Sequence, residues 1–196
     1  MSAIPKKKLT EAQYLDIEGA AEFRSEFFNG EMFAMAGASR EHNELKDNLI
    51  GELHARLKGG PCRTYSVDMR VHVKRTGLYT YPDIVIVCGR GEFDRYKGVD
   101  ILLNPQIVIE ILSESTARYD RGTKFDNFQC LPSVKEYILV SQDKMCVERF
   151  VRQPDEQWLL TTFDDPAGEF SLATIAICIP LVDVYRGVEL KEPPML

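Results

Sequence analysis

Two short apolar runs, each carrying one acidic residue, constrain the fold of this chain most strongly. The first is YPDIVIVC, residues 81–88, with Asp83 near its start, and the second is QIVIEIL, residues 106–112, with Glu110 near its end. Both are too short for typical helices and rich in Ile and Val, so they predict buried strands. A carboxylate in such a strand is costly to desolvate without a partner. Two adjacent strands of this kind would form an acidic pocket that requires a cation, either a metal ion or a lysine.

The composition is typical of a globular protein. The chain has 196 residues, of which 44% are hydrophobic and 28% charged, so we expect a single domain over residues 1–196. No run approaches the roughly 18 apolar residues of a membrane helix. The N-terminal sequence MSAIPKKKLT lacks the apolar core of a secretory signal. We therefore expect a cytoplasmic location, no membrane partner and no organic cofactor.

The cysteines do not form a recognisable metal-binding or disulfide pattern. They are five in number, far apart and without a CxxC pair: Cys62, Cys88, Cys130, Cys146 and Cys178. Three of them lie in apolar strand-like runs. We expect reduced, mostly buried thiols and no zinc site.

The net charge of −6 is unevenly distributed along the chain. Residues 153–196 contain eight acidic and two basic residues, whereas residues 54–75 contain six basic residues and one acidic residue, Asp68. The basic stretch is either a solvated helix end and strand edge or a stripe that contacts phosphates. Together with a polar loop expected over residues 89–104, it is our candidate for substrate contact.

Local signals predict alternating helices and strands. Thr10 and Gln13 fit a capping box for a short helix ending at Gly19. Residues 23–35 predict a hairpin around Asn29-Gly30. A longer helix follows Ser39, with an apolar stripe at Leu45, Leu49, Leu53 and Leu57.

The second half of the chain predicts further strands and one more helix. We expect a strand pair around residues 62–74, a helix over 117–130, strands over 134–140, 145–152 and 157–163, and a final apolar stretch over 172–182. This order is typical of an α/β domain with a mixed β-sheet.

The acidic residues and a lysine resemble the PD-(D/E)xK nuclease superfamily, which has the restriction-endonuclease-like fold. Pro82-Asp83 matches the first half of that motif, and Glu110-Ile111-Leu112 matches the second half except that Leu112 replaces the Lys. Lys124 is well placed for branches in which this lysine has moved to the following helix. The closer resemblance is to the Uma-type family of endonucleases. It rests on three blocks: SEFFNGEMFAMAGASREHNEL, YPDIVIVC and IVIEILSESTARYDRGTKFDNFQCLPSVKEYILV.

The resemblance covers roughly residues 8–185 and implies a mixed β-sheet flanked by helices, with additional C-terminal strands. It also implies site roles. Asp83 and Glu110 would bind Mg²⁺ or Mn²⁺, with the Ile111 carbonyl as a third ligand, and Lys124 would position the attacking water. Glu26 would be a further ligand or orienting residue, and His42 would contact phosphate or water. Asp120 matches the acid one turn before the lysine. Glu114 departs from the family, which usually has Pro there.

The expected function is metal-dependent hydrolysis of phosphodiester bonds in DNA, by a homodimer if both strands of a duplex are cut. An alternative is a catalytically inactive nuclease-fold module that binds nucleic acid or a protein partner. In that case Glu110 and Lys124 would form a structural ion pair. A third reading, a glycoside hydrolase with two carboxylates, would need an aromatic-lined cleft.

Overall fold

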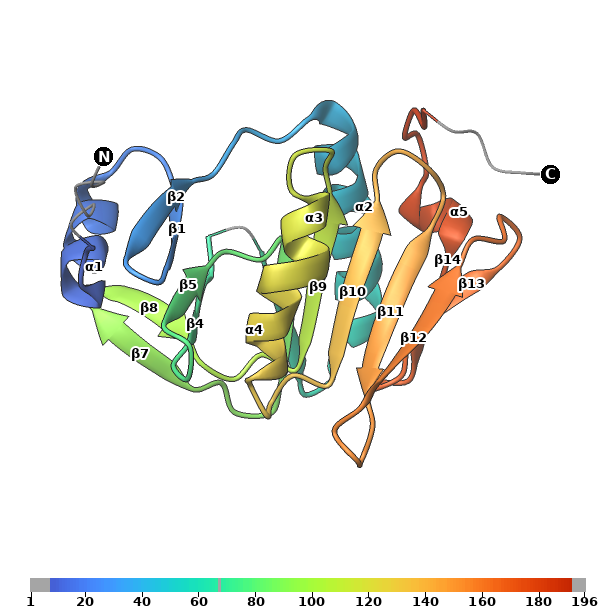
Figure 1. The fold of residues 1–196 in the computed structure, drawn as a ribbon. Helices are drawn as coiled ribbons and strands as arrows, with labels where there is room; N and C mark the ends of the chain where they lie inside the picture. The colour runs from blue at the N-terminus through green and yellow to red at the C-terminus, as the bar shows by residue number, and fades with distance from the viewer. Residues whose placement is uncertain (1–7, 67, 192–196) are drawn as a thin grey trace.

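The computed structural model describes residues 8–66 and 68–191, which form two six-stranded sheets and a smaller two-stranded one. The first sheet has the strand order β2-β1-β5-β4-β8-β7. Its strands are β1 (Ser25–Phe28), β2 (Glu31–Ala34), β4 (Arg70–Val73), β5 (Leu78–Thr80), β7 (Phe93–Tyr96) and β8 (Val99–Leu102). Helix α1 (Glu11–Ala20) packs on this sheet at one end of the molecule, in blue in Figure 1.

The local signals at the N-terminus are confirmed. Thr10 accepts a hydrogen bond from the Gln13 backbone N–H, and the Gln13 side chain accepts one from the Thr10 backbone N–H, which completes the capping box. Strands β1 and β2 form the predicted hairpin, and Asn29 and Gly30 both adopt positive φ in its turn.

The second sheet has the order β12-β11-β10-β9-β6-β3. Its strands are β3 (Cys62–Ser66), β6 (Ile84–Cys88), β9 (Ile107–Leu112), β10 (Glu136–Ser141), β11 (Val147–Arg152) and β12 (Trp158–Phe163). Strands β9 and β10 are parallel, whereas β6 pairs antiparallel with β9. The sheet is therefore mixed, as predicted.

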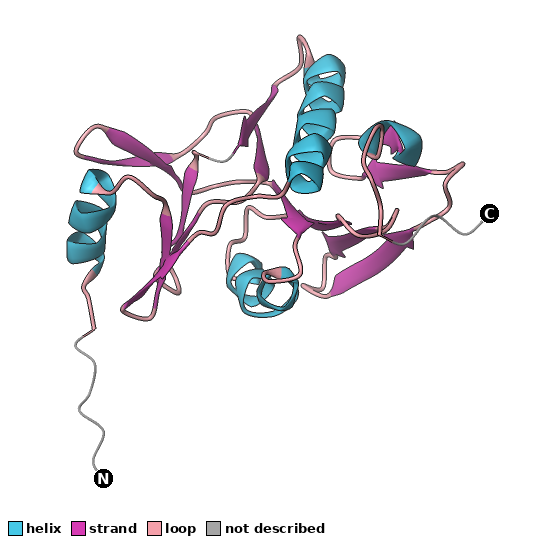
Figure 2. Ribbon diagram, turned by 90° about the horizontal axis from the view of Figure 1, so that it is seen from above, coloured by secondary structure: helices cyan, strands magenta, loops and turns pink. Residues whose placement is uncertain are grey.

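Helices cover both faces of the second sheet, which explains why its central strands β9 and β10 are buried and mostly apolar on both faces. Helix α2 (Arg40–Leu57) lies on one face, and α3 (Ala117–Tyr119), η1 (Asp120–Lys124) and α4 (Phe125–Gln129) lie on the other, as Figure 2 shows from above. The α2 stripe from Leu45 to Leu57 is buried against Ile84, Ile86 and Ile109. Val85, Val87 and Val108 pack instead with Phe125 and Phe128.

The chain ends with the expected additional C-terminal strands. Strands β13 (Glu169–Leu172) and β14 (Ile177–Pro180) form a hairpin, followed by α5 (Leu181–Val184). Their buried side chains Phe170, Ile179 and Leu181 join the core on the α2 side. The predicted fold class, a mixed α/β structure with helices flanking the sheet, is confirmed.

Two local predictions are wrong, and a third is confirmed with one unexpected feature. Strands β3 and β4 do not pair with each other, because β3 joins β6 in the second sheet and β4 joins β5 and β8 in the first. Residues 89–104 contain the β7–β8 hairpin, whose turn at Lys97-Gly98 has positive φ at both residues. The helix predicted over 117–130 is present over 117–129, and its middle, Asp120–Lys124, is a π-helical turn, η1.

The prediction that all cysteines are reduced is also wrong. Cys62 and Cys88 lie directly opposite each other on β3 and β6 and form a disulfide. Of the other three cysteines, Cys146 is buried, Cys130 is half-buried and Cys178 is exposed.

The basic stretch 54–75 is not a continuous surface stripe. Arg70 is buried, and its side chain donates a hydrogen bond to the Tyr81 hydroxyl. Lys74 forms an ion pair with Asp94 at 2.8 Å, and Arg56 pairs with Glu52. Arg70 therefore cannot contact a phosphate from this position.

No helix within residues 8–66 and 68–191 is long and apolar enough to cross a membrane. The prediction about a secretory signal concerns mainly residues 1–7, which lie outside the described residues.

Candidate active site

The two acid-bearing strands are neighbours, as the sequence predicts. Strand β6 pairs with β9 so that Ile84 lies opposite Ile109, and this register continues to bring Asp83 opposite Glu110. The Ile111 backbone N–H donates a hydrogen bond to Asp83 Oδ2 at 2.8 Å, and the Asp83 N–H donates to Glu110 Oε2 at 3.4 Å. The two carboxylates therefore share one face of the second sheet, at the point where the chain leaves β5 and enters β6.

Within the described residues, Lys124 has the only ammonium group that forms an ion pair with either of these two acids. Its Nζ atom lies 2.8 Å from Glu110 Oε1, 3.3 Å from Glu26 Oε1 and 3.5 Å from Asp120 Oδ1. All four side chains are nearly fully buried. We call Glu26, Asp83, Glu110, Asp120 and Lys124 the Lys124 cluster.

Glu26 and His42 reach the Lys124 cluster from two other elements. Glu26, on β1, accepts a hydrogen bond from the Thr80 hydroxyl and pairs with Lys124. His42, in the first turn of α2, has its Nε2 atom 3.2 Å from Asp83 Oδ2. The structure thus brings together Asp83, Glu110, Lys124, Glu26 and His42, all five predicted site side chains.

The cluster contains more acidic than basic groups. Burial raises the pKa of Glu110 well above its ordinary value, and repulsion from Asp120 and Asp83 adds to this shift against the opposing effect of Lys124. Burial also raises the pKa of Asp120. Burial alone would lower the pKa of Lys124, but Glu110, Glu26 and Asp120 raise it above its ordinary value, so the ammonium stays charged.

The π-helical turn η1 orients the Lys124 side chain toward strands β1 and β9. Its first and last residues, Asp120 and Lys124, are both buried and ion-paired with each other. The Tyr137 hydroxyl donates a hydrogen bond to the Asp120 carbonyl at 2.9 Å, so a side chain from β10 takes part in the hydrogen bonding of this turn. Turns of this kind are frequent at functional sites.

The two departures from the nuclease motif have different surroundings. Leu112, at the position of the expected Lys, is buried with Phe125 and Phe128, and the Lys124 ammonium lies beside Glu110 instead. Glu114 is highly exposed, with Lys191 Nζ 3.9 Å from its carboxylate, and makes no ion pair with the cluster.

Sequence reasoning missed two residues that border the cluster, Thr80 and Tyr119. Burial and the neighbouring carboxylate of Glu26 raise the pKa of the Tyr119 hydroxyl. Position could have revealed them, because Thr80 precedes the Pro82-Asp83 pair and Tyr119 precedes Asp120. Their residue types alone gave no signal.

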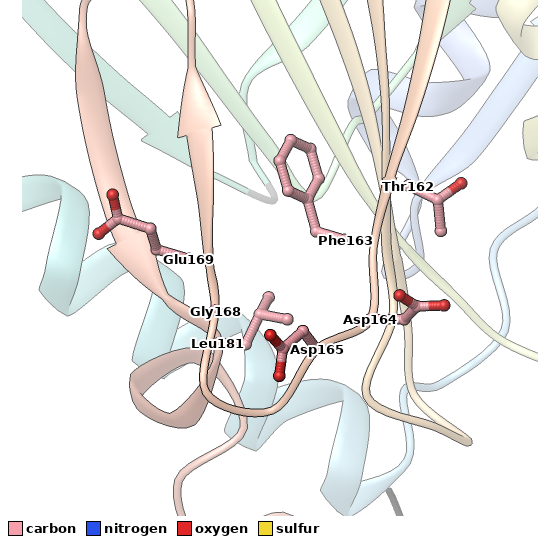
Figure 3. A pocket seen from close by; sticks show the side chains of 7 residues that line it. All are labelled: Thr162, Phe163, Asp164, Asp165, Gly168, Glu169 and Leu181. Atoms are coloured by element: carbon pink, nitrogen blue, oxygen red, sulfur yellow. The ribbon is translucent and has the colours of Figure 1, made fainter. Parts of the chain in front are cut away.

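Two further observations bear on ligand binding. Across residues 8–66 and 68–191, no group of three or more His, Cys, Asp or Glu side chains is arranged to hold a metal ion as the side chains stand. A small pocket elsewhere, shown in Figure 3, is lined by the exposed carboxylates of Asp164, Asp165 and Glu169. None of the predicted site residues lines it.

The fold is similar to that of a solved nuclease-like protein. The crystal structure of "a putative nuclease belonging to DUF820" from Anabaena variabilis ATCC 29413 superposes with a TM-score of 0.73. The superposition covers 90% of this chain and 97% of that one, at 18% sequence identity. At this identity the likeness shows the fold alone, a mixed α/β fold that the two chains share.

The chain belongs to the Uma2 family, whose description is "Putative restriction endonuclease" and whose model matches residues 11–178. Two proteins of Synechocystis sp. (strain ATCC 27184 / PCC 6803 / Kazusa), both named as uncharacterized, are similar over most of their length. The protein slr1290 is 30% identical over 94% of this chain and 95% of its own, and sll1609 is 35% identical over 87% and 96%. The family inferred from the sequence motifs is therefore confirmed.

Proposed function

We propose that this protein is a metal-dependent endonuclease that hydrolyses phosphodiester bonds of DNA. The observation that carries the proposal is the meeting of Asp83 and Glu110 on adjacent strands, with the Lys124 ammonium 2.8 Å from Glu110. Membership of the Uma2 family supports hydrolysis of nucleic acid as the reaction class. We further propose a cytoplasmic location. We also propose a homodimer, because one such site cuts one strand of a duplex.

The cluster fits a hard divalent cation by its charge and its donor atoms. Three carboxyl groups pair with one ammonium and a fourth, that of Asp83, lies beside Glu110, and Mg²⁺ and Mn²⁺ prefer such oxygen donors. Asp83, whose side chain is 18% exposed, is the most accessible of the four. We propose that Asp83 and Glu110 hold the ion, with the Ile111 carbonyl as a further ligand. The bound ion would lower the pKa of water and offset charge on the phosphate.

The other side chains would act directly on water and substrate. Lys124, freed in part from Glu110, would orient the attacking water and balance the negative charge that develops on the phosphoryl oxygens. Glu26 would keep the Lys124 ammonium in place. His42, next to Asp83 at 3.2 Å and close to the N-terminus of α2, would fix the Asp83 carboxylate and approach the phosphate.

One observation favours a second candidate, the inactive binding module. Lys124 already neutralises Glu110, and the described side chains include no ready group of three metal ligands. A closed ion-pair network of this kind would be purely structural. Metal binding separates the two candidates, because a structural network does not need the ion.

The test compares wild type with Asp83→Asn on supercoiled plasmid and single-stranded DNA, with Mg²⁺, Mn²⁺ or EDTA. We expect metal-dependent cleavage by wild type and a loss of at least about 100-fold in the variant. Asp165→Asn, in the exposed pocket of Figure 3, is the matched control and should cleave as wild type does. Equal cleavage by wild type and Asp83→Asn would indicate a contaminant. Absence of cleavage on every substrate would favour the binding module.

A further inference from the structure

The outer strand of the β1–β2 hairpin carries an aromatic residue beside the Lys124 cluster. Phe33 on β2 lies directly opposite Glu26 on β1. Residues opposite each other in an antiparallel pair share one face of the sheet, with their Cβ atoms about 4.5–5.5 Å apart. Met32 and Phe27 point to the other face, where they pack with Tyr14. Phe33 therefore lies on the face of the hairpin that Glu26 presents to Lys124.

Phe33 is one of several exposed residues at this end of the hairpin. Its exposed fraction is 49%, compared with 75% for Phe23 and 37% for Met35. The Met35 N–H donates a hydrogen bond to the Arg24 carbonyl at 2.9 Å, so Met35 and Arg24 are neighbours across the two strands. We call Phe23, Arg24, Phe33 and Met35 the hairpin rim.

Arg24 adds a positive charge to the aromatic and apolar surface of the rim. The Arg24 side chain is 45% exposed and pairs with Asp68 at 3.4 Å, a surface contact of little energetic weight. The Arg24 guanidinium also lies 5.7 Å from the centroid of the Tyr81 ring, so turning to a phosphate would give up two weak contacts. Phe33 and Arg24 lie on neighbouring segments of the hairpin, two residues apart in register. An exposed aromatic ring and an arginine on one surface are the combination with which proteins bind single-stranded nucleic acid, by stacking on bases and pairing with the backbone.

We infer that the hairpin rim binds an unpaired nucleobase of the substrate, with the base stacked on Phe33 and the adjacent phosphate paired with Arg24. Bases in a regular duplex are stacked on each other and cannot reach Phe33. The protein would therefore prefer single-stranded or locally opened DNA to intact duplex. The inference rests on the proposed function in taking nucleic acid as the ligand. A nucleic acid fits this surface better than a protein does, because the surface adjoins Glu26 of the cluster and carries a cation.

The test measures binding in EDTA, where no metal-dependent cleavage occurs. A fluorescently labelled single-stranded oligonucleotide and its duplex are titrated with wild type, Phe33→Ala, Phe33→Trp and Leu160→Ala. Leu160, an apolar residue of β12 with an exposed fraction of 48%, provides the control. We expect Phe33→Ala to weaken single-strand binding about tenfold and to leave duplex binding unchanged. Leu160→Ala should behave as wild type.

Phe33→Trp provides a direct reading of stacking. It should retain the affinity of wild type for single strands, and its added fluorescence should be quenched on binding, whereas the emission of Trp158 in wild type should not change. Equal losses on single strand and duplex, no loss with Phe33→Ala, or no binding to either oligonucleotide would overturn the inference. So would a change from dimer to monomer in Phe33→Ala with unchanged oligonucleotide affinity, because the rim would then be a subunit interface.

The failure of this inference can be separated from failure of the proposed function. Loss of cleavage in Asp83→Asn together with Phe33-independent binding would refute only the role of the rim. Phe33-dependent single-strand binding by a protein that never cleaves would refute only the nuclease activity.

Discussion

The molecule contains two buried charge clusters on either side of the β5–β6 connection, and they are built differently. In the first, which we call the Arg70 cluster, Glu18, Ser25, Arg70 and Tyr81 meet beneath α1. Arg70 Nε donates to the Tyr81 hydroxyl at 2.7 Å, which donates in turn to Glu18 Oε1 at 2.9 Å. The Ser25 N–H donates to both Glu18 oxygens at 3.1 Å. One carboxylate meets one guanidinium, and the charges balance.

The Lys124 cluster lacks this balance. Glu26, Glu110 and Asp120 all pair with the single Lys124 ammonium, and Asp83 lies beside Glu110. The energetic cost of placing these acids together in the core is reflected in the raised pKa values of Glu110 and Asp120, and burial is the largest cause of both shifts. A network built only for stability would match its charges, as the Arg70 cluster does. The excess of acids therefore supports a site for a further cation.

The largest expected effect comes from breaking the balanced cluster. Glu18→Gln would leave the Arg70 charge buried without a carboxylate, and we expect the free energy of unfolding to fall by about 3 kcal/mol. Urea denaturation measures this loss. Unchanged stability would mean that Tyr81 alone is sufficient to satisfy Arg70, and the contrast between the clusters would weaken.

The corresponding change in the unbalanced cluster should have the opposite sign. In EDTA, Glu110→Gln removes one buried charge while Lys124 keeps Glu26 and Asp120 as partners. We expect the free energy of unfolding to rise by about 0.5–2 kcal/mol, as is common when a destabilising functional residue is replaced. The same denaturation series measures it. A loss as large as that of Glu18→Gln would identify Glu110 as a structural partner of Lys124.

A smaller effect concerns His72, which stacks on Tyr79 in the first sheet with ring centroids 3.8 Å apart. Burial lowers the pKa of His72 below its ordinary value, with Glu11 opposing the shift. A lowered pKa contributes stability above the unfolded-state pKa of about 6.5, and this contribution is lost as the pH falls toward the folded-state value. We therefore expect His72→Phe, which keeps an aromatic ring at this position, to lose less stability than wild type between about pH 7 and pH 5 in thermal melts. Parallel pH profiles would exclude His72 as a source of acid sensitivity.

The sequence predicted which side chains meet in the Lys124 cluster better than it predicted their surroundings. Asp83 and Glu110 were recognisable because a carboxylate in an Ile/Val strand needs a cation, and the family motif pointed to Lys124 on the next helix. Helix periodicity could not reveal the π-helical turn, because the turn depends on long-range contacts such as the one from Tyr137 to Asp120. The expectation that residues 1–196 form a single domain stays a prediction.

The surface was harder to predict because charge patterns do not report burial. Arg70 was predicted to belong to a basic surface stripe. In the structure it is buried in the core, where it pairs with Glu18, a residue far away in the sequence. Likewise, the position of Phe33 opposite Glu26 follows from the register of the hairpin and not from the type of residue.

The most direct test of the central claim is a titration with Mn²⁺ monitored by electron paramagnetic resonance, which reads the free ion without requiring a substrate. Wild type, Asp83→Asn and the control Asp165→Asn are compared. Our account predicts that wild type and Asp165→Asn bind the ion alike and that Asp83→Asn loses this binding. Equal binding by all three proteins, or by none, would contradict the claim that the unbalanced Lys124 cluster is a metal site.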